Sequence, residues 1–428
     1  MNERPYVGLK AALAILTVIL FVVGANAATE TVLYNFSVGA GGSYPYASLV
    51  FDAAGNLYGT TEEGGIYDQG VVFELTLKAD GGWTKKVVHM FNPNARDGAL
   101  PYAGLIIDKV GDLYGTTALG GDLACNEGFG CGIVFELTPK GNGDWKETVL
   151  YRFNGANGFQ PLGNVVFDGA GNLYGTTAVG GAYGDGTVFE LMPKAGGGWT
   201  ERVLHNFDRG TNDGVSPYAG VILDSTGNLY GTTVGGGTYD WGTVFELTPK
   251  AGGGWKEKIL HNFNNNHKDG AAPQASLVFD ALGNLYGTTR IGGSAGGCST
   301  EGCGTVFELT PEADGGWTEK VVHTFRFNGA DGHFPTASLI LDASDNLYGT
   351  TLAGGTHNDG TAFELTPKAD GVWTEVVLHS FYLNHGTDGT SPSAGLIFDA
   401  SGNLYGTTSE GGTGTCKYGC GTAFEITP

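Results

Sequence analysis

A glutamate and a histidine recur at fixed places along the chain, and both residue types can do chemistry. The glutamate stands in seven GTVFELTP-like runs, and seven carboxylates could form a ring. In four copies a basic residue follows twelve positions later, across an expected hairpin, so a cross-strand ion pair is the simpler interpretation. The glutamates are Glu74, Glu136, Glu190, Glu246, Glu308, Glu364 and Glu425, and the basic residues are Lys86, Arg202, Lys258 and Lys320.

The histidine lies in a VLHxF run and is absent from two copies, where Tyr34 and Tyr151 take its place. Its neighbours are valine and phenylalanine, so we interpret it as a packing residue of an outer strand and not as a ligand. The histidines are His89, His205, His261, His323 and His379. From these repeated residues we predict no metal site.

The cysteines form three close pairs, Cys125 with Cys131, Cys298 with Cys303 and Cys416 with Cys420. Each pair lies in a loop that is longer than its counterparts without cysteine. Zinc is disfavoured, because each pair offers only two ligands and these loops contain no histidine. We therefore predict three local disulfides, which require an oxidising compartment.

The first 27 residues have the features of an export signal. Arg4 and Lys10 precede an apolar run over 11–23, and Ala25 and Ala27 offer small side chains for cleavage. The alternative is a permanent membrane anchor. We predict a cleaved signal peptide over 1–27, and therefore a periplasmic or secreted protein without a transmembrane domain in the mature chain.

The overall composition is acidic and rich in glycine. There are 22 Lys plus Arg against 44 Asp plus Glu, a net charge of −22, which argues against a nucleic-acid partner. Glycine makes up 76 of the 428 residues, whereas hydrophobic residues reach 41%. These values predict a folded chain with many tight turns.

A repeat organises everything after the signal. The string LYGTT occurs seven times, with tyrosines at Tyr58, Tyr114, Tyr174, Tyr230, Tyr286, Tyr348 and Tyr405. Each copy contains four short runs rich in Val, Ile, Phe, Tyr and Thr, separated by turn residues and without helical periodicity. This pattern predicts an all-β, seven-bladed β-propeller of four-stranded blades, as a single domain over 28–428.

The strands at the two ends of the chain together make up one complete repeat. The last copy stops after its third strand, at 421–428, whereas an orphan fourth strand over 31–36 follows the signal. We expect this strand to pair beside Phe424 and to close the ring. We also expect a monomer.

The runs DxxGNLYGTTxxGG, GTVFELTP and WTEKVLHxF resemble the GloVer tandem repeat of exported bacterial proteins, named after Gloeobacter and Verrucomicrobia. The resemblance covers essentially all of the mature chain and implies no established reaction or ligand. The DxxGNLY pattern is distantly similar to NHL-type propeller blades, in which the run before DxxGN lies innermost. That strand order implies that the GG loops and the DGxxP loops share one face.

Because one axial ligand cannot use seven identical residues, we expect a binding site among residues that depart from the repeat. On the face bearing the GG and DGxxP loops, aromatic and polar residues of this kind suit carbohydrate or protein binding. The candidates are Tyr67, Tyr183, Tyr239, Trp241, His357, Arg290, His267, His333 and His385. Further residues of this kind are Arg96, Asn157 and Lys268, and three tyrosines that follow the repeated proline, Tyr46, Tyr102 and Tyr218.

Two classes of function fit these residues. The first is an exported, non-catalytic binding or scaffold propeller with an extracellular carbohydrate or protein ligand. The alternative is a polysaccharide lyase or glycoside hydrolase, with His267, His333 or His385 as an acid–base group. We predict no cofactor; five DG-loop aspartates allow calcium as an alternative, although the turn explains them. They are Asp97, Asp213, Asp269, Asp331 and Asp388.

Overall fold

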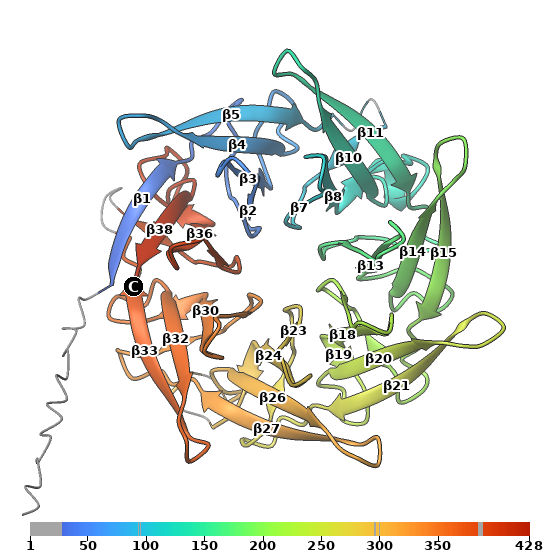
Figure 1. Ribbon diagram of the computed structural model, residues 1–428, viewed down its shortest axis with the longest axis vertical. Coiled ribbons are helices and arrows are strands. Elements are labelled where there is room, and N and C mark those ends of the chain that lie inside the picture. Colours follow the sequence, from blue (N-terminus) through green and yellow to red (C-terminus); the bar gives the residue numbers. More distant parts are fainter. Residues whose placement is uncertain (1–27, 93, 95, 295–296, 299, 384–387) are drawn as a thin grey trace, which may run out of the picture.

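Seven four-stranded antiparallel blades surround a central axis in the computed structural model (Figure 1). The structure describes residues 28–428 except 93, 95, 295–296, 299 and 384–387. Helical structure in that part is confined to short 3-10 turns such as η2 (Asn126–Gly128). The all-β, seven-bladed prediction is confirmed, whereas the signal segment over 1–27 and the candidate His385 lie outside the described residues.

Each blade runs outward from a two-residue inner strand. The inner strands are β2 (Val50–Phe51), β7 (Ile106–Ile107), β12 (Val166–Phe167), β17 (Ile222–Leu223), β23 (Val278–Phe279), β29 (Ile340–Leu341) and β35 (Ile397–Phe398). The LYGTT strands follow as β3 (Leu57–Thr61), β8 (Leu113–Thr117), β13 (Leu173–Thr177), β18 (Leu229–Thr233), β24 (Leu285–Thr289), β30 (Leu347–Thr351) and β36 (Leu404–Thr408).

The two outer strands of each blade are longer. The third strands are β4 (Val71–Leu77), β10 (Ile133–Pro139), β14 (Thr187–Pro193), β20 (Thr243–Pro249), β26 (Thr305–Pro311), β32 (Thr361–Pro367) and β38 (Thr422–Thr427). The fourth strands are β5 (Trp83–Met90), β11 (Trp145–Arg152), β15 (Trp199–Asn206), β21 (Trp255–Asn262), β27 (Trp317–Thr324), β33 (Trp373–Ser380) and β1 (Thr29–Asn35).

The N-terminal strand β1 completes the last blade. It pairs antiparallel with β38, with Val32 opposite Phe424, and Figure 1 shows the blue strand beside the red one. The predicted closure is confirmed. No blade is therefore left with an unpaired third strand.

The DGxxP and GG loops pair with each other in short two-stranded sheets. These are β6 (Gly98–Ala99) with β9 (Leu119–Gly120), β16 (Gly214–Val215) with β19 (Gly235–Gly236), β22 (Gly270–Ala271) with β25 (Ile291–Gly292), β28 (Gly332–His333) with β31 (Ala353–Gly354), and β34 (Gly389–Thr390) with β37 (Glu410–Gly411). The two loop types therefore share one face, as predicted. The DxxGN turns and the glycine-rich turns end the strands on the opposite face.

The hydrophobic core lies between neighbouring blades. At every junction a phenylalanine after the fourth strand packs edge-on against the third-strand phenylalanine of the next blade, with ring centroids 5.0–5.2 Å apart. Phe36 with Phe73 closes this ring of seven contacts. All of these rings are fully or almost fully buried. Burial of large apolar rings at every junction stabilises the ring as one unit.

The LYGTT string is explained by packing and hydrogen bonding. In the first blade, the hydroxyl of Tyr58 lies 3.3 Å from Asp52 of the DxxGN turn and 3.2 Å from Glu74 of the third strand. Gly59 lies under Phe73, so that a Cβ there would approach the ring to 2.6 Å. The Thr60 hydroxyl donates to the carbonyl of Ala103 in the next blade, and all seven blades repeat this bond.

The predicted ion pairs of the third-strand glutamates are mostly wrong. The register is as expected, with Glu246 opposite Lys258, but only Arg202 pairs with its glutamate, Glu190. The lysine ammonium groups instead donate to carbonyls in the glycine-rich turn of the next blade, as Lys320 does to Gly371 at 2.8 Å. The same bond joins Lys86 to Gly143 and Lys258 to Gly315. The glutamates accept the tyrosine hydroxyl instead.

The fourth-strand histidines pack as predicted. Each ring lies edge-on against the phenylalanine two residues later, with centroids 4.6–4.8 Å apart. The three predicted disulfides are also formed, Cys125–Cys131, Cys298–Cys303 and Cys416–Cys420. Each closes a loop of only a few residues, so it fixes loop shape more than it stabilises the fold.

Lys85, at the junction where the ring closes, predicts a pH-dependent stability. Its ammonium lies 5.0 Å from the Tyr34 ring and 4.6 Å from the Phe36 ring, and donates to the carbonyl of Gly41. Burial lowers the pKa of Lys85 to about 8. The unfolded chain therefore binds the proton more tightly, and stability rises with pH from about 8 to the ordinary lysine pKa.

The comparison is with Lys85→Met, which keeps the length of the side chain. Between pH 8 and pH 10, the difference in the free energy of unfolding between the wild type and the variant should shift by roughly 2 kcal/mol in favour of the wild type. Denaturant titrations at several pH values measure this difference. A difference that stays constant or shrinks over this range would show that the ammonium is not desolvated.

Candidate functional site

A cavity of about 570 Å³ lies on the axis, at the face bearing the GG and DGxxP loops. The residue after each repeated proline contributes to its wall, so all seven blades take part. These residues are Tyr46, Tyr102, Leu162, Tyr218, Gln274, Thr336 and Ser393. Four consecutive blades of the ring supply three tyrosines and a leucine, and the other three supply short or polar side chains. The sevenfold backbone thus carries an asymmetric site.

The axis narrows below this cavity. A second hollow of about 130 Å³ is lined by the same seven residues after the prolines and by the two mostly small residues that follow each of them. Here the Asn164 amide oxygen accepts from the backbone of Gly104 at 2.7 Å, and the Ser338 hydroxyl accepts from Ser276 at 3.1 Å. A Cβ on Gly220 would lie only 2.1 Å from the carbonyl of Asn164. This constriction leaves the loop face as the natural entrance for a ligand.

The cavity wall is held by an unusual backbone. The residue before each repeated proline has a positive φ, between 53° and 60°, although none is glycine. These residues are Tyr44, Leu100, Gln160, Ser216, Ala272, Phe334 and Ser391. In the second blade, Leu100 donates to the carbonyl of Gln69 in the preceding blade at 2.9 Å and accepts from Ala118 at 3.0 Å. Side chains rarely adopt this conformation, so the wall is fixed by its hydrogen bonds at a cost in strain.

A half-buried acid, Glu62, lies behind the aromatic side of the cavity. The rings of Tyr46 and Tyr102 lie 5.8 Å apart, and the Tyr102 hydroxyl donates to the carboxylate of Glu62. Burial raises the pKa of Glu62, an effect that the Tyr102 hydrogen bond opposes. Burial also raises the pKa of Tyr46 to about 12, with the charge of Glu62 adding to the shift. The two tyrosines therefore stay neutral hydrogen-bonding groups at ordinary pH.

The position after LYGTT has opposite charges in two blades. Glu62 occupies it in the first blade and Arg290 in the fifth, whereas the other five blades carry uncharged residues there. Arg290 lines the axial cavity, with its guanidinium carbon 5.8 Å from the centre of the Phe334 ring. The cavity therefore offers an aromatic wall, a guanidinium and, beside Tyr102, a carboxylate.

The loop-tip aromatic candidates lie elsewhere on the same face. Tyr67, Tyr183 and Tyr239 are 43%, 61% and 51% exposed, and among these described residues none lines the axial cavity. Trp241 packs against the core between the fourth and fifth blades. Arg290 is the member of the original candidate set that the structure brings to the axis, beside the three tyrosines after the prolines.

The histidine candidates have separate surroundings. His333 is 5% exposed between the rings of Phe327 and Phe334, and burial lowers its pKa. His357 stacks on Tyr382 at 3.9 Å, and His267 is exposed with a φ of 67°. Among the described residues, no contact joins these histidines, and His333 is sealed from a ligand at the cavity mouth.

Sequence reasoning missed the pairing of Glu62 with Tyr102. Glu62 departs from the repeat at a position held elsewhere by Ala, Val, Leu, Ser or Arg, and this departure was a usable signal. Leu162, Gln274, Thr336 and Ser393 were missed for a different reason. The residue after the proline is the one column of the repeat to which all seven blades contribute in the cavity wall, and the sequence prediction considered only its tyrosines.

These features define a seven-bladed β-propeller with an asymmetric axial cavity on one face. The Gloeobacter/Verrucomicrobia repeat family model matches residues 17–211 and 196–424, and the chain belongs to that family. No match is found among curated proteins. In the described part of the chain, no helix is long and apolar enough to span a bilayer.

One solved structure is similar over nearly the full length. It is the crystal structure of a protein of unknown function from Dyadobacter fermentans DSM 18053, at 13% sequence identity and a TM-score of 0.46. The similarity covers 94% of this chain and 98% of that one.

Proposed function

We propose that this protein is an exported, non-catalytic binding or scaffold propeller whose ligand, a carbohydrate or a protein, occupies the axial cavity. The observation that carries the proposal is the one-sided wall, with Tyr46, Tyr102 and Tyr218 facing a polar side that includes Gln274. Aromatic rings provide flat apolar faces for sugar rings or apolar side chains, and the polar groups give orientation. A cavity of about 570 Å³ lies within the size range of ligand sites.

The charged side chains at the cavity restrict the class of ligand that it can bind. The guanidinium of Arg290 suits a carboxylate, sulfate or other anionic group. The Glu62–Tyr102 pair, on the aromatic side, suits hydroxyl or amide donors. An acidic sugar unit or an acidic peptide combines both features, whereas a purely apolar ligand would offer no partner to the Arg290 guanidinium.

Export is the second part of the proposal. It rests on the predicted signal over 1–27 and on three disulfides, which persist in oxidising compartments. The exposed aromatic side chains of Tyr67, Tyr183 and Tyr239 belong to the same face and would extend the site for a ligand longer than the cavity.

A catalytic alternative is favoured by one observation, the contact between Tyr102 and Glu62. A tyrosine and a carboxylate with a raised pKa can act as an acid–base pair on a polysaccharide, as in a lyase or a glycoside hydrolase. The burial of His333 removes one of the histidines first considered for that role.

A screen of the chain from residue 28 on glycan and peptide arrays tests the proposal. We expect hits among acidic glycans or acidic peptides, with each hit recovered intact after prolonged incubation. If the protein cleaves a hit and Glu62→Gln abolishes cleavage while it retains binding, the protein is an enzyme and the non-catalytic proposal is wrong. If no array ligand binds, the binding proposal is overturned.

A further inference from the structure

Five of the seven blade junctions bring together a histidine, an aspartate and a glutamate. The histidine comes from the fourth strand, the aspartate from the DG loop that follows, and the glutamate from the fourth strand of the next blade. Within each cluster of described residues, one ligand atom per side chain lies within 4.8 Å of the others. The clusters are His89–Asp97–Glu147, His205–Asp213–Glu257, His261–Asp269–Glu319, His323–Asp331–Glu375 and His379–Asp388–Glu30.

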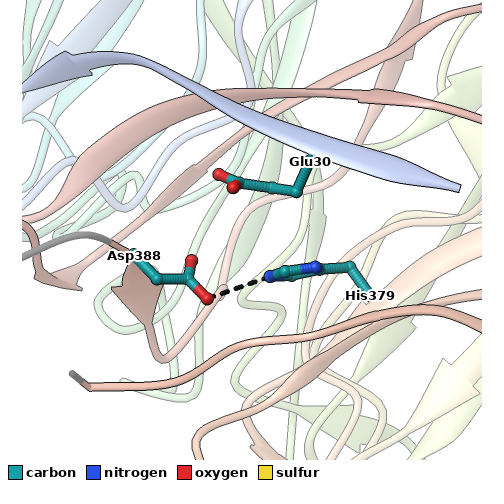
Figure 2. A group of neighbouring side chains, drawn as sticks. All are labelled: Glu30, His379 and Asp388. Atoms are coloured by element: carbon teal, nitrogen blue, oxygen red, sulfur yellow. Dashed lines mark hydrogen bonds and ion pairs between the residues drawn. The ribbon is translucent and has the colours of Figure 1, made fainter.

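Figure 2 shows one of them, in which Glu30 of β1 faces His379 and Asp388 from the neighbouring blade. In this cluster and three others, the histidine Nε2 is hydrogen-bonded to the aspartate at 2.9–3.1 Å. The donor atoms thus converge from two blades. A group bound between them would connect those blades directly.

The cluster between the fifth and sixth blades is open. His323 Nε2 lies 3.6 Å from Asp331 Oδ1 and 3.8 Å from Glu375 Oε2. Both His323 Nε2 and Asp331 Oδ1 are buried without a hydrogen-bond partner, and Asp331 is 7% exposed. Ligands of a tetrahedral ion with bonds of 2.0–2.2 Å are separated by about 3.3–3.6 Å. The open cluster therefore has nearly the spacing that a metal ion requires.

The negative charge of the two carboxylates in the open cluster also favours a bound cation. Two carboxyl groups, Asp331 and Glu375, lie together in a mostly buried site. Buried neighbouring carboxylates require either a shared proton or a bound cation.

At the two remaining junctions the histidine and the aspartate are replaced together, and at the closing junction the glutamate is replaced as well. Between the second and third blades, Tyr151 and Asn157 replace the histidine and the aspartate, and both contact Glu201 at Oε2. At the closing junction the corresponding residues are Tyr34, Gly41 and Lys85, and the lysine places its own ammonium there. The histidine is present only where both acids are. A shared ligand explains this dependence, and so does the direct hydrogen bond between the histidine and the aspartate in four of the clusters.

The open cluster can be reached from solvent. A cavity of about 600 Å³ is lined by His323, Asp331 and Glu375, together with Arg326 and Trp373. It provides an entry path and room for a water molecule to complete the coordination of a three-ligand ion.

We propose that these five junction clusters are binding sites for divalent transition-metal ions, which clip neighbouring blades together. One imidazole nitrogen and two carboxylates suit Zn²⁺. Ca²⁺ prefers an all-oxygen ligand set and is disfavoured by the histidine. The turn bonds of the aspartates persist in this arrangement, as with the Arg326 amide, which donates to Asp331 Oδ2 at 3.0 Å.

The test uses the untagged chain from residue 28, stripped with a chelator and dialysed against micromolar Zn²⁺ or Ca²⁺. Bound metal is then counted by elemental analysis. We expect about five Zn²⁺ per chain. His323→Tyr with Asp331→Asn should lose one, and Tyr151→His with Asn157→Asp should gain one. Both variants copy residue pairs that the protein already uses at another junction, so both should fold.

Thermal unfolding of the metal-free proteins checks that folding, and Zn²⁺ should raise the unfolding temperature of the wild type. The proposal is overturned if no Zn²⁺ binds, or if the Zn²⁺ count is the same in both variants and the wild type. Binding of Ca²⁺ in place of Zn²⁺ would also overturn it, because the histidine would then not be a ligand.

Discussion

Removing residues 28–37 is expected to destroy the closed ring. The deletion takes away β1, its pairing with β38 and the buried Phe36, which packs against Phe73 of the first blade. The exposed edge of β38 then becomes available for pairing between molecules. We expect the free energy of unfolding to fall by about 5 kcal/mol or more, which is comparable to the whole stability of a marginally stable domain, and aggregation in size-exclusion chromatography.

A permuted chain is the matched control. Thr29 lies opposite Thr427, so the turn sequence of residues 194–198 can join Pro428 to Ala28 and place the missing strand after β38 in its native register. This permutant should unfold close to the wild-type temperature. If the deletion chain is monomeric and as stable as the wild type, the closure does not hold the ring.

The second large effect is expected from Phe245→Ala. Phe245 of β20 is completely buried, and its ring lies 5.2 Å from that of Phe207 in the preceding blade. Truncation leaves a cavity at a junction between blades, which typically lowers the free energy of unfolding by about 3–5 kcal/mol. Urea titration followed by tryptophan fluorescence measures it.

Leu282→Ala serves as the control, because Leu282 is 84% exposed in a DxxGN turn. Its effect should stay within about 0.5 kcal/mol. Equal effects of the two substitutions would contradict the assignment of the core to the blade junctions.

The fold was predictable because each repeat carries its own local signals. LYGTT, the DxxGN turn and the alternating runs specify strands and hairpins within one blade, and the orphan strand over 31–36 reveals the closure. Each signal acts over a few residues, where strand periodicity and turn chemistry are reliable. The disulfides were predictable for the same reason, since each pair lies within one loop.

Contacts between blades were much harder to predict. Lys258 lies opposite Glu246 in the register but reaches a turn of the next blade, because neighbouring blades pack closely enough for a long side chain to cross. The Tyr102 hydroxyl likewise donates a hydrogen bond to Glu62, which belongs to the preceding blade. Such pairs cannot be recognised from the sequence of a single repeat, because the two partners belong to different repeats.

The junction clusters illustrate the same limit. The histidines were interpreted as packing residues and not as ligands, and the DG aspartates as turn residues. The packing and the turn bonds are present, but the proposed metal sites would make the histidines ligands as well. Asp97, for example, accepts from the backbone of Gly98 at 2.6 Å and from that of Asn92 at 3.0 Å. The glutamate two residues after the fourth-strand tryptophan, such as Glu147, was not predicted to be part of a site, because its partners lie in the preceding blade.

The axial site is tested most directly by the affinity of Tyr46→Ala with Tyr102→Ala for a ligand found in the array screen. Both rings line the axial cavity, so we predict at least a tenfold weaker Kd, or about 1.4 kcal/mol, by calorimetry. The control is Leu282→Ala, on the opposite face, which should bind like the wild type. Unchanged affinity in the double variant, with its unfolding temperature preserved, would contradict the assignment of the axial cavity as the binding site.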